Sequence, residues 1–171
     1  MDHNTIPFKQ RKLDWIFVGF FLINLFFITY IVDIEQLIIS NPSNFQQPFW
    51  PPSPMVKMIH WYGNSFDPLL IARPQWWKMT IWVDTLLYGP FYALATYAFI
   101  RGKDWIRIPA IFYSGMMFMG VTVILGEEVA GPHATPQLPL VLGLNLPWLL
   151  MPVFLTLRLR NEHPFGRNNS K

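Results

Sequence analysis

The chain has 171 residues, of which 52% are hydrophobic and only 13% are charged, whereas soluble domains carry about a quarter charged residues, so the composition indicates a membrane protein. The net charge of +3, with scattered basic residues, argues against a nucleic-acid partner. The absence of cysteine excludes disulfides and thiolate sites, and the four histidines lie too far apart for the usual ligand spacings, so we expect no metal site and no cofactor.

Four apolar stretches are predicted to cross the bilayer as helices, because about 20 apolar residues are needed to span ~30 Å of hydrocarbon. The first follows a basic flank, the second contains Gly89 and Pro90, which allow a kink or a widened turn, and the third precedes an expected turn over residues 127–139. The sequence therefore predicts a single all-α transmembrane domain covering residues 1–171. Its four helices are expected at about residues 14–35, 76–100, 106–126 and 138–158.

The segment between the first and second stretches, residues 40–75, is rich in proline and aromatic side chains. Because proline breaks long helices, we expect at most a short helix there, around Met55 to Tyr62. Two interpretations stay open: a cap loop that packs over the four-helix bundle, or an aromatic belt that rests on the bilayer surface.

Two acidic residues within the apolar stretches are the first candidates for a functional site. An acid at membrane depth is costly and normally faces a bundle interior or a cavity. At ~1.5 Å per residue, Asp33 lies about 27 Å along the first stretch from Trp15. The second stretch crosses the bilayer in the opposite direction, and Asp84 lies about 12 Å along it from Trp76. The two carboxyl groups therefore occupy the same half of the membrane and meet if the two helices are neighbours.

Two carboxyl groups in a pocket of low dielectric constant cannot comfortably both ionise, so one should hold a proton while the other stays charged. Such a pair suits a cationic amine, a proton-handling step or a buried hydrogen bond. The alternative is structural: Asp33 caps its helix in water, and Asp84 bonds to a neighbouring hydroxyl group.

Ten of the 13 Lys and Arg residues lie on the side that holds both termini and the loop after the second stretch. By the positive-inside rule this side is cytoplasmic. The ten are Lys9, Arg11, Lys12, Arg101, Lys103, Arg107, Arg158, Arg160, Arg167 and Lys171; the other side has Lys57, Arg73 and Lys78.

Several segments of the chain resemble a known family. They are FDPLL at residues 66–70, the Pro-x-Trp-x-Lys pattern and following acid in residues 74–84, ATYAF at 95–99, and WIRxPAIxYS at 105–114. These are similar to the sigma-2 receptor family, also called the transmembrane protein 97 family, within the EXPERA group that includes emopamil-binding protein. The resemblance implies a multi-pass protein of the endoplasmic reticulum membrane, often homodimeric, that acts as a receptor in sterol homeostasis or trafficking. It implies a cavity for sterols or other lipids and for cationic amphiphilic small molecules.

The resemblance also implies roles for individual residues. The family's first-span acid pairs a ligand amine and its second-span acid hydrogen-bonds the first, and these roles fall on Asp33 and Asp84. The family's loop Asp and Tyr fall on Asp67 and Tyr62, although an Asp before Pro commonly starts a turn, so a structural role for Asp67 stays open. The expected ligand-binding residues are Asp33, Asp84, Asp67, Tyr62, Tyr88, Asn145 and Trp148.

The chain departs from the family in ways that leave other functions open. The second-span acid is usually Glu, and two tyrosines of the fourth span are replaced by Asn145 and Trp148, a spacing that resembles the sterol isomerase branch. A sterol Δ8–Δ7 isomerase is therefore the second hypothesis. That branch, however, carries a His and a Glu in its first span, whereas the first span of this chain has Asn24 and neither of them before Asp33. We therefore expect no catalytic residues. The third hypothesis is a scaffold or chaperone for a Niemann-Pick-type sterol transporter. The family's dilysine tail is reduced to Lys171.

Overall fold

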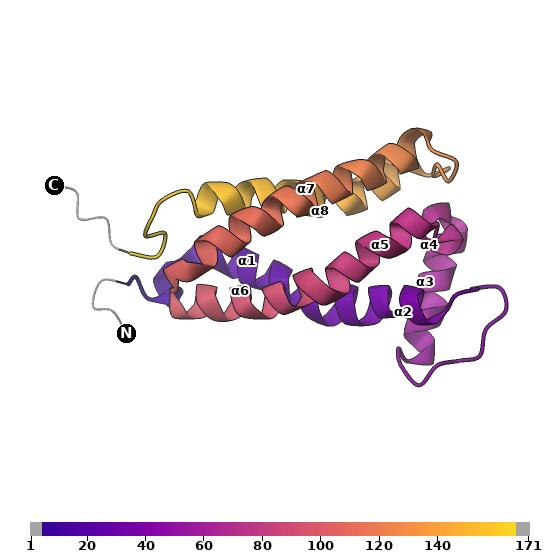
Figure 1. Cartoon of the computed structure of the whole chain (residues 1–171), viewed down its shortest axis with the longest axis horizontal. Coiled ribbons are helices and arrows are strands. Elements are labelled where there is room, and N and C mark those ends of the chain that lie inside the picture. Colours follow the sequence, from indigo (N-terminus) through magenta and orange to yellow (C-terminus); the bar gives the residue numbers. More distant parts are fainter. Residues whose placement is uncertain (1–4, 167–171) are drawn as a thin grey trace.

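The computed structural model describes residues 5–166, and the regular secondary structure in this part of the chain is helical, apart from one isolated antiparallel bridge between Thr5 and Gly166 (Figure 1). The all-α prediction is confirmed. Arg167 and Lys171, used above to assign orientation, lie outside the described residues. The shorter elements are η1 (Phe8–Gln10), α2 (Ile34–Ile38), α4 (Pro68–Ala72) and η4 (Asp104–Ile106), and the longer ones are introduced below.

The first long helix runs without a break from Lys12 to Ile38 and has three parts. Between α1 (Lys12–Ile23) and α2 lies η2 (Asn24–Asp33), where the backbone widens into a π-helix. The helix ends where Ile39 becomes extended. Asp33 therefore lies inside a continuous helix rather than at its end in water.

The segment between the first and second long helices is more ordered than its prolines suggested. The expectation of one short helix around Met55 to Tyr62 was wrong, because α3 covers Ser53–Ser65 and α4 follows at once. Pro54 lies in the first turn of α3, where its missing N–H interrupts no helical hydrogen bond. In Figure 1, α3 and α4 lie across the end of the molecule opposite the termini.

The second long helix runs from Gln75 to Arg101 as α5 (Gln75–Val83), η3 (Asp84–Tyr88) and α6 (Gly89–Arg101). The turn before Gly89 and Pro90 is indeed widened, since η3 is a π-helix. Proline has no N–H to donate to the preceding turn and its ring crowds the carbonyl there, which favours a wider turn. Each of the two acids thus sits at the end of a π-helical segment.

The third and fourth long helices are α7 (Arg107–Ala130) and α8 (Leu138–Arg158). The expected turn over 127–139 is shorter than predicted, because α7 continues through Glu127 and Glu128 and ends only before Gly131. Glutamate is a good helix former, so nothing stops the helix earlier.

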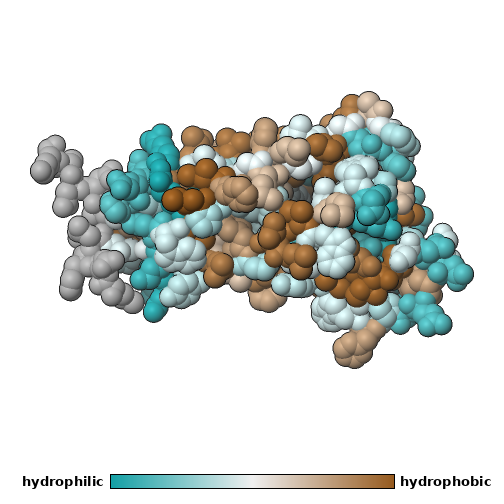
Figure 2. Space-filling view, viewed as in Figure 1, coloured by the Kyte–Doolittle hydropathy of each residue, from teal (hydrophilic) through white to brown (hydrophobic). Residues whose placement is uncertain are grey.

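Within residues 5–166, three helical stretches are long and apolar enough to cross a membrane: Lys12–Ile38, Asp104–Ala130 and Leu138–Arg158. The stretch Gln75–Arg101 is equally continuous but is not among these three. Figure 2 shows hydrophobic side chains over the middle of one face and hydrophilic ones at both ends. The chain is therefore a multi-pass membrane protein.

The helices pack in two pairs, α1 with α6 and α7 with α8. Phe21 and Phe99 meet edge to face with ring centroids 5.4 Å apart, and the fully buried Ala95 and Ala98 allow α1 and α6 to approach closely. In Figure 1, α7 begins beside α6 near the termini and rises away from α2 toward the other end.

Candidate functional site

A cavity of about 1160 Å³ lies between the helix pairs, toward the end that carries α3 and α4. Its wall is mostly apolar, with methionines and aromatic rings from several helices. All seven residues that the sequence singled out line it. They are Asp33, Asp84, Asp67, Tyr62, Tyr88, Asn145 and Trp148. The structure thus brings the predicted residues together, while their binding of a ligand stays a prediction.

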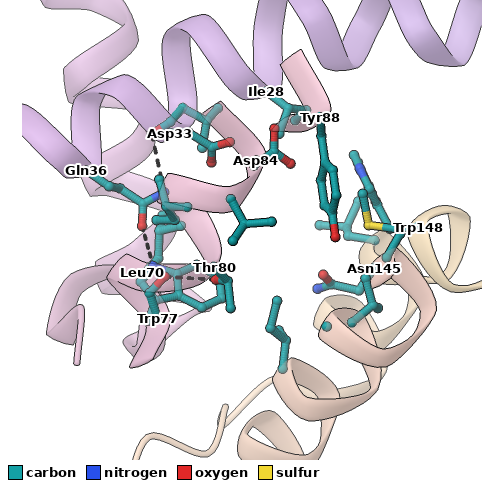
Figure 3. A pocket seen from close by; sticks show the side chains of 18 of the residues that line it. Ile28, Asp33, Gln36, Leu70, Trp77, Thr80, Asp84, Tyr88, Asn145 and Trp148 are labelled. Carbon is teal, nitrogen blue, oxygen red and sulfur yellow. Dashed lines mark hydrogen bonds between the residues drawn. The ribbon is translucent and has the colours of Figure 1, made fainter. Parts of the chain in front are cut away.

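The two acids meet on one wall of the cavity (Figure 3). The carboxyl groups of Asp33, at the end of η2, and Asp84, at the start of η3, are in hydrogen-bonding contact. The depth argument correctly placed these two side chains together. Asp84 also bonds to a neighbouring hydroxyl, as the structural alternative proposed, because Thr29 Oγ1 donates to its Oδ1 at 2.6 Å.

The close approach of η2 to η3 requires a glycine at position 89. A Cβ built on Gly89 would lie 2.9 Å from Cγ2 of Thr29, too close for an ordinary contact. With no side chain there, Thr29 is fully buried and comes within reach of Asp84. Sequence reasoning missed Thr29, although it precedes Asp33 by four residues and so shares a helix face with it.

The opposite wall of the cavity includes Asn145 and Trp148 of α8 (Figure 3). The indole N–H of Trp148 donates to Oδ1 of Asn24 at 2.7 Å, and the amide of Asn24 donates to the carbonyl of Phe20 at 2.7 Å. Asn145 donates to the carbonyl of Val141 within its own helix. This hydrogen bond across the bundle holds the N–H edge of the Trp148 ring in place, and no motif predicts it.

Asp67 and Tyr62 form the end of the cavity next to α3 and α4. Asp67 accepts a hydrogen bond from the backbone N–H of Leu70 at 3.1 Å and so caps α4, which confirms the expected structural role. Its carboxyl group also contacts that of Glu128 at the end of α7. Burial raises the pKa of Asp67, and burial, with Asp67 and Glu128 nearby, raises the pKa of Tyr62 to about 12.

A buried ion cluster beside the cavity joins α4 to the first helix. Nη2 of Arg73 donates to both carboxylate oxygens of the fully buried Glu35, at 3.0 Å to Oε1 and 2.7 Å to Oε2. Nε2 of His60 lies 2.7 Å from Oε1 of the same carboxylate. Arg73 also donates to the carbonyl groups of Leu70 and Ile39. Sequence reasoning used Arg73 only to assign orientation, since the two partners are 38 positions apart.

Taken together, the fold and the site define a helical multi-pass membrane protein with an acidic pair in an apolar cavity. The family model EXPERA (EXPanded EBP superfamily) matches residues 54–159, and the chain belongs to this family. It is 32% identical over 160 residues to Sigma intracellular receptor 2 of Xenopus tropicalis, covering 87% of this chain and 88% of that protein. It is 26% identical to the proteins of the same name from Macaca fascicularis and Homo sapiens, covering 92% of this chain and 93% of each.

Proposed function

We propose that this chain is a receptor-like protein of the endoplasmic reticulum membrane that binds sterols or other lipids and cationic amphiphiles in its cavity, with a role in sterol homeostasis or trafficking. One observation carries the proposal: an acid pair lies in a cavity of about 1160 Å³ whose other walls are mostly apolar. Small-molecule sites typically combine apolar walls with a few converging polar groups. The similarity to proteins named Sigma intracellular receptor 2 supports the receptor-like role.

The acid pair sets the chemistry of the ligand's polar end. Two carboxyl groups in contact at low dielectric constant hold one proton between them and therefore carry one negative charge. A protonated amine neutralises this charge with charge-assisted hydrogen bonds, while a sterol hydroxyl donates to the same oxygens. The apolar remainder of either ligand meets the aromatic and methionine side chains of the wall.

The proposal includes a membrane topology. Residues 75–101 form a fourth span, both termini face the cytoplasm, and the α3–α4 segment (Ser53–Ala72) caps the cavity on the lumenal side. The excess of basic residues on the side of the termini supports this orientation. Residues of α3 and α4, including Met58, Tyr62 and Leu70, contribute to the cavity wall, which supports the role of a cap.

Equilibrium binding tests the proposed function. The purified protein in lipid nanodiscs should bind a radiolabelled cationic amphiphile saturably, and cholesterol should compete. The double variant Asp33→Asn/Asp84→Asn should lose the amphiphile, whereas Asp104→Asn, a matched change of a partly exposed acid near the termini, should not. Unchanged binding by a folded double variant would contradict the proposal.

One observation favours a second function, sterol Δ8–Δ7 isomerisation: Trp148, whose ring could stabilise a carbocation, lines the same cavity as the acid pair. One carboxyl group of the pair would protonate an alkene carbon and a carboxylate would take a proton from another. Incubation with a Δ8-sterol and mass spectrometry of the products tests this. A shifted double bond that disappears in the double variant would support the isomerase; unconverted sterol supports the receptor.

A further inference from the structure

A second acid pair, Asp67 and Glu128, lies where the α3–α4 segment meets the end of α7. Asp67 is 6% exposed and Glu128 is 1% exposed, and their carboxyl groups are in contact. Oε2 of Glu128 receives no hydrogen bond, and no basic side chain among residues 5–166 forms an ion pair with either acid. Two buried carboxylates in contact repel each other, so this contact requires a proton held by one of them.

Polar contacts join the α3–α4 segment to α7 and α8 at this point. Thr135, in the loop after α7, donates its hydroxyl hydrogen to the carbonyl of Phe66, and its backbone N–H donates to the carbonyl of Glu128 at 3.0 Å. The packing of α3 on η2 is more extensive than the packing of α3 or α4 on α7 and α8. In Figure 1 the turn between α7 and α8 lies at the same end of the molecule as α4. This junction therefore depends strongly on its polar contacts.

The junction also closes one end of the cavity. Tyr62 and Asp67 line the cavity on one side of the junction. Val121 and Ile124, which precede Glu128 by about two turns and one turn of α7, line it on the other side. Separation of the α3–α4 segment from α7 would therefore open the cavity at this end.

The contact within the second acid pair depends on pH. Burial raises the pKa of Asp67, so the closed junction binds the proton more tightly than an open, hydrated junction does. The stabilisation by this contact is therefore complete below the ordinary value of about 4, and it is lost as the pH rises through the raised value. The other titratable groups that face the pair are Tyr62 of α3, whose pKa burial raises to about 12, and Glu127 of α7, which contacts His133.

We infer that the second acid pair is a pH-dependent switch: it holds the α3–α4 segment against α7 while the two acids share a proton, and it releases this end of the cavity once the proton is lost. The conformational change is a property of the fold. Its effect on ligand exchange rests on the proposed function and extends it.

The separation of two spin labels tests the switch. The chain has no cysteine, so Ser65→Cys and Ala134→Cys, at exposed positions on the two sides of the junction, place labels only there. In lipid nanodiscs, the ratio of the open to the closed population should rise between about pH 5 and 9, by up to about tenfold per pH unit for the loss of one proton. A ratio that does not change with pH would overturn the inference.

Matched substitutions separate the second acid pair from other titrating groups. Glu128→Gln keeps an N–H donor toward Asp67 and has no proton to lose, so the population ratio should stay low at every pH. Asp67→Asn, whose amide oxygen still caps α4, should have the same effect, whereas Glu127→Gln should keep the full pH dependence. Thr135→Val should raise the ratio about fivefold at every pH, the scale of one hydrogen bond. A pH dependence that survives in Glu128→Gln and Asp67→Asn, or disappears in Glu127→Gln, would overturn the assignment.

Ligand dissociation links the switch to the cavity. A radiolabelled quaternary ammonium amphiphile does not titrate. At about pH 8.5 it should leave the unsubstituted protein several-fold faster than Glu128→Gln, in proportion to the open population, and at about pH 5 the two rates should be equal. Equal rates at both pH values would overturn the effect on ligand exchange. No saturable binding by the unsubstituted protein would contradict the proposed function, while the spin labels would still decide whether the switch exists.

Discussion

Two buried acidic sites at opposite ends of this molecule differ in how their charge is compensated. At the end with the termini, Asp14 is held by Arg11 and by Arg158, whose Nε lies 2.7 Å from Oδ1, so the acid is fully compensated. Arg11 also donates to the carbonyl of Phe99 at 2.6 Å, which ties α1 to α6. At the other end, Asp33 and Asp84 face each other, and no Lys, Arg or His among residues 5–166 forms an ion pair with either of them. The comparison teaches that Asp14, like Glu35, is compensated by arginine and serves packing, whereas the acid pair lacks such a partner, which is what the proposed ligand site requires.

The largest effect is expected from neutralising the compensated acid. Asp14→Asn leaves the buried guanidinium group of Arg11 and the partly buried one of Arg158 without a counter-charge, so it should lower the free energy of unfolding by about 3–5 kcal/mol. Thermal unfolding in detergent, followed by circular dichroism, measures this. Asp104→Asn, a change of a partly exposed acid, is the control. Equal melting temperatures of the two variants would show that the ion pairs of Asp14 do not stabilise the fold.

Neutralising the buried acid of the ion cluster beside the cavity should also destabilise the protein, but only in the neighbouring α3–α4 segment. Glu35→Gln leaves Arg73 buried without its carboxylate and should destabilise the docking of α3–α4 by about 3 kcal/mol. Hydrogen exchange should therefore accelerate across residues 53–72 and stay unchanged in α6. Glu127→Gln, a change of a less buried acid, serves as the control. Uniform acceleration along the chain would show that the cluster supports the whole fold rather than this segment.

Substitution of the acid pair by asparagine should raise the free energy of unfolding, whereas Asp14→Asn should lower it. Asp33→Asn/Asp84→Asn removes a buried charge that no Lys, Arg or His side chain among residues 5–166 neutralises, so the ligand-free protein should gain about 1 kcal/mol of stability as it loses binding. The measurement is the same thermal unfolding as for Asp14→Asn. A loss of stability comparable to that of Asp14→Asn would mean that the pair is structural.

The smallest effect concerns pH. Burial raises the pKa of Asp67, so the folded state binds the proton more tightly than the unfolded state does. The contribution is therefore favourable at low pH and is lost as pH rises from about 3.9, the unfolded value, through the raised folded value. Glu128 and Tyr62 are the titratable groups that face Asp67.

Asp67→Asn should flatten this pH dependence, because the amide oxygen still caps α4 and the side chain no longer ionises. Hydrogen exchange of residues 68–72 across this pH range, corrected for the intrinsic rate, provides the readout. An unchanged slope in the variant would show that another group causes the dependence.

Much of this arrangement could be predicted from the sequence because it follows from local rules. Counting residues at ~1.5 Å per step placed Asp33 and Asp84 in the same half of the membrane, within reach of each other if their helices are neighbours. Gly89 and Pro90 predicted the widened turn. The length of α3 was missed because Pro54 was counted as a helix breaker, although proline in a first turn breaks nothing.

The missed features are contacts between distant parts of the chain. Asn24 and Trp148 are 124 positions apart, and Glu35 and Arg73 are 38 apart. No periodicity or motif links such residues, because their meeting depends on how the helices pack. Thr29 is intermediate: its spacing from Asp33 was readable, but its bond to Asp84 depends on the close approach at Gly89.

Proton counting on ligand binding tests the central claim most directly. Isothermal titration of a quaternary ammonium amphiphile into the protein near pH 7, in buffers of different ionisation enthalpy, gives the number of protons exchanged. A pair that already shares one proton carries the single negative charge the ligand needs, so the account predicts a heat independent of the buffer. Release of one proton per ligand would show that both acids are neutral beforehand, uptake of one would show that both are charged, and either result would contradict it.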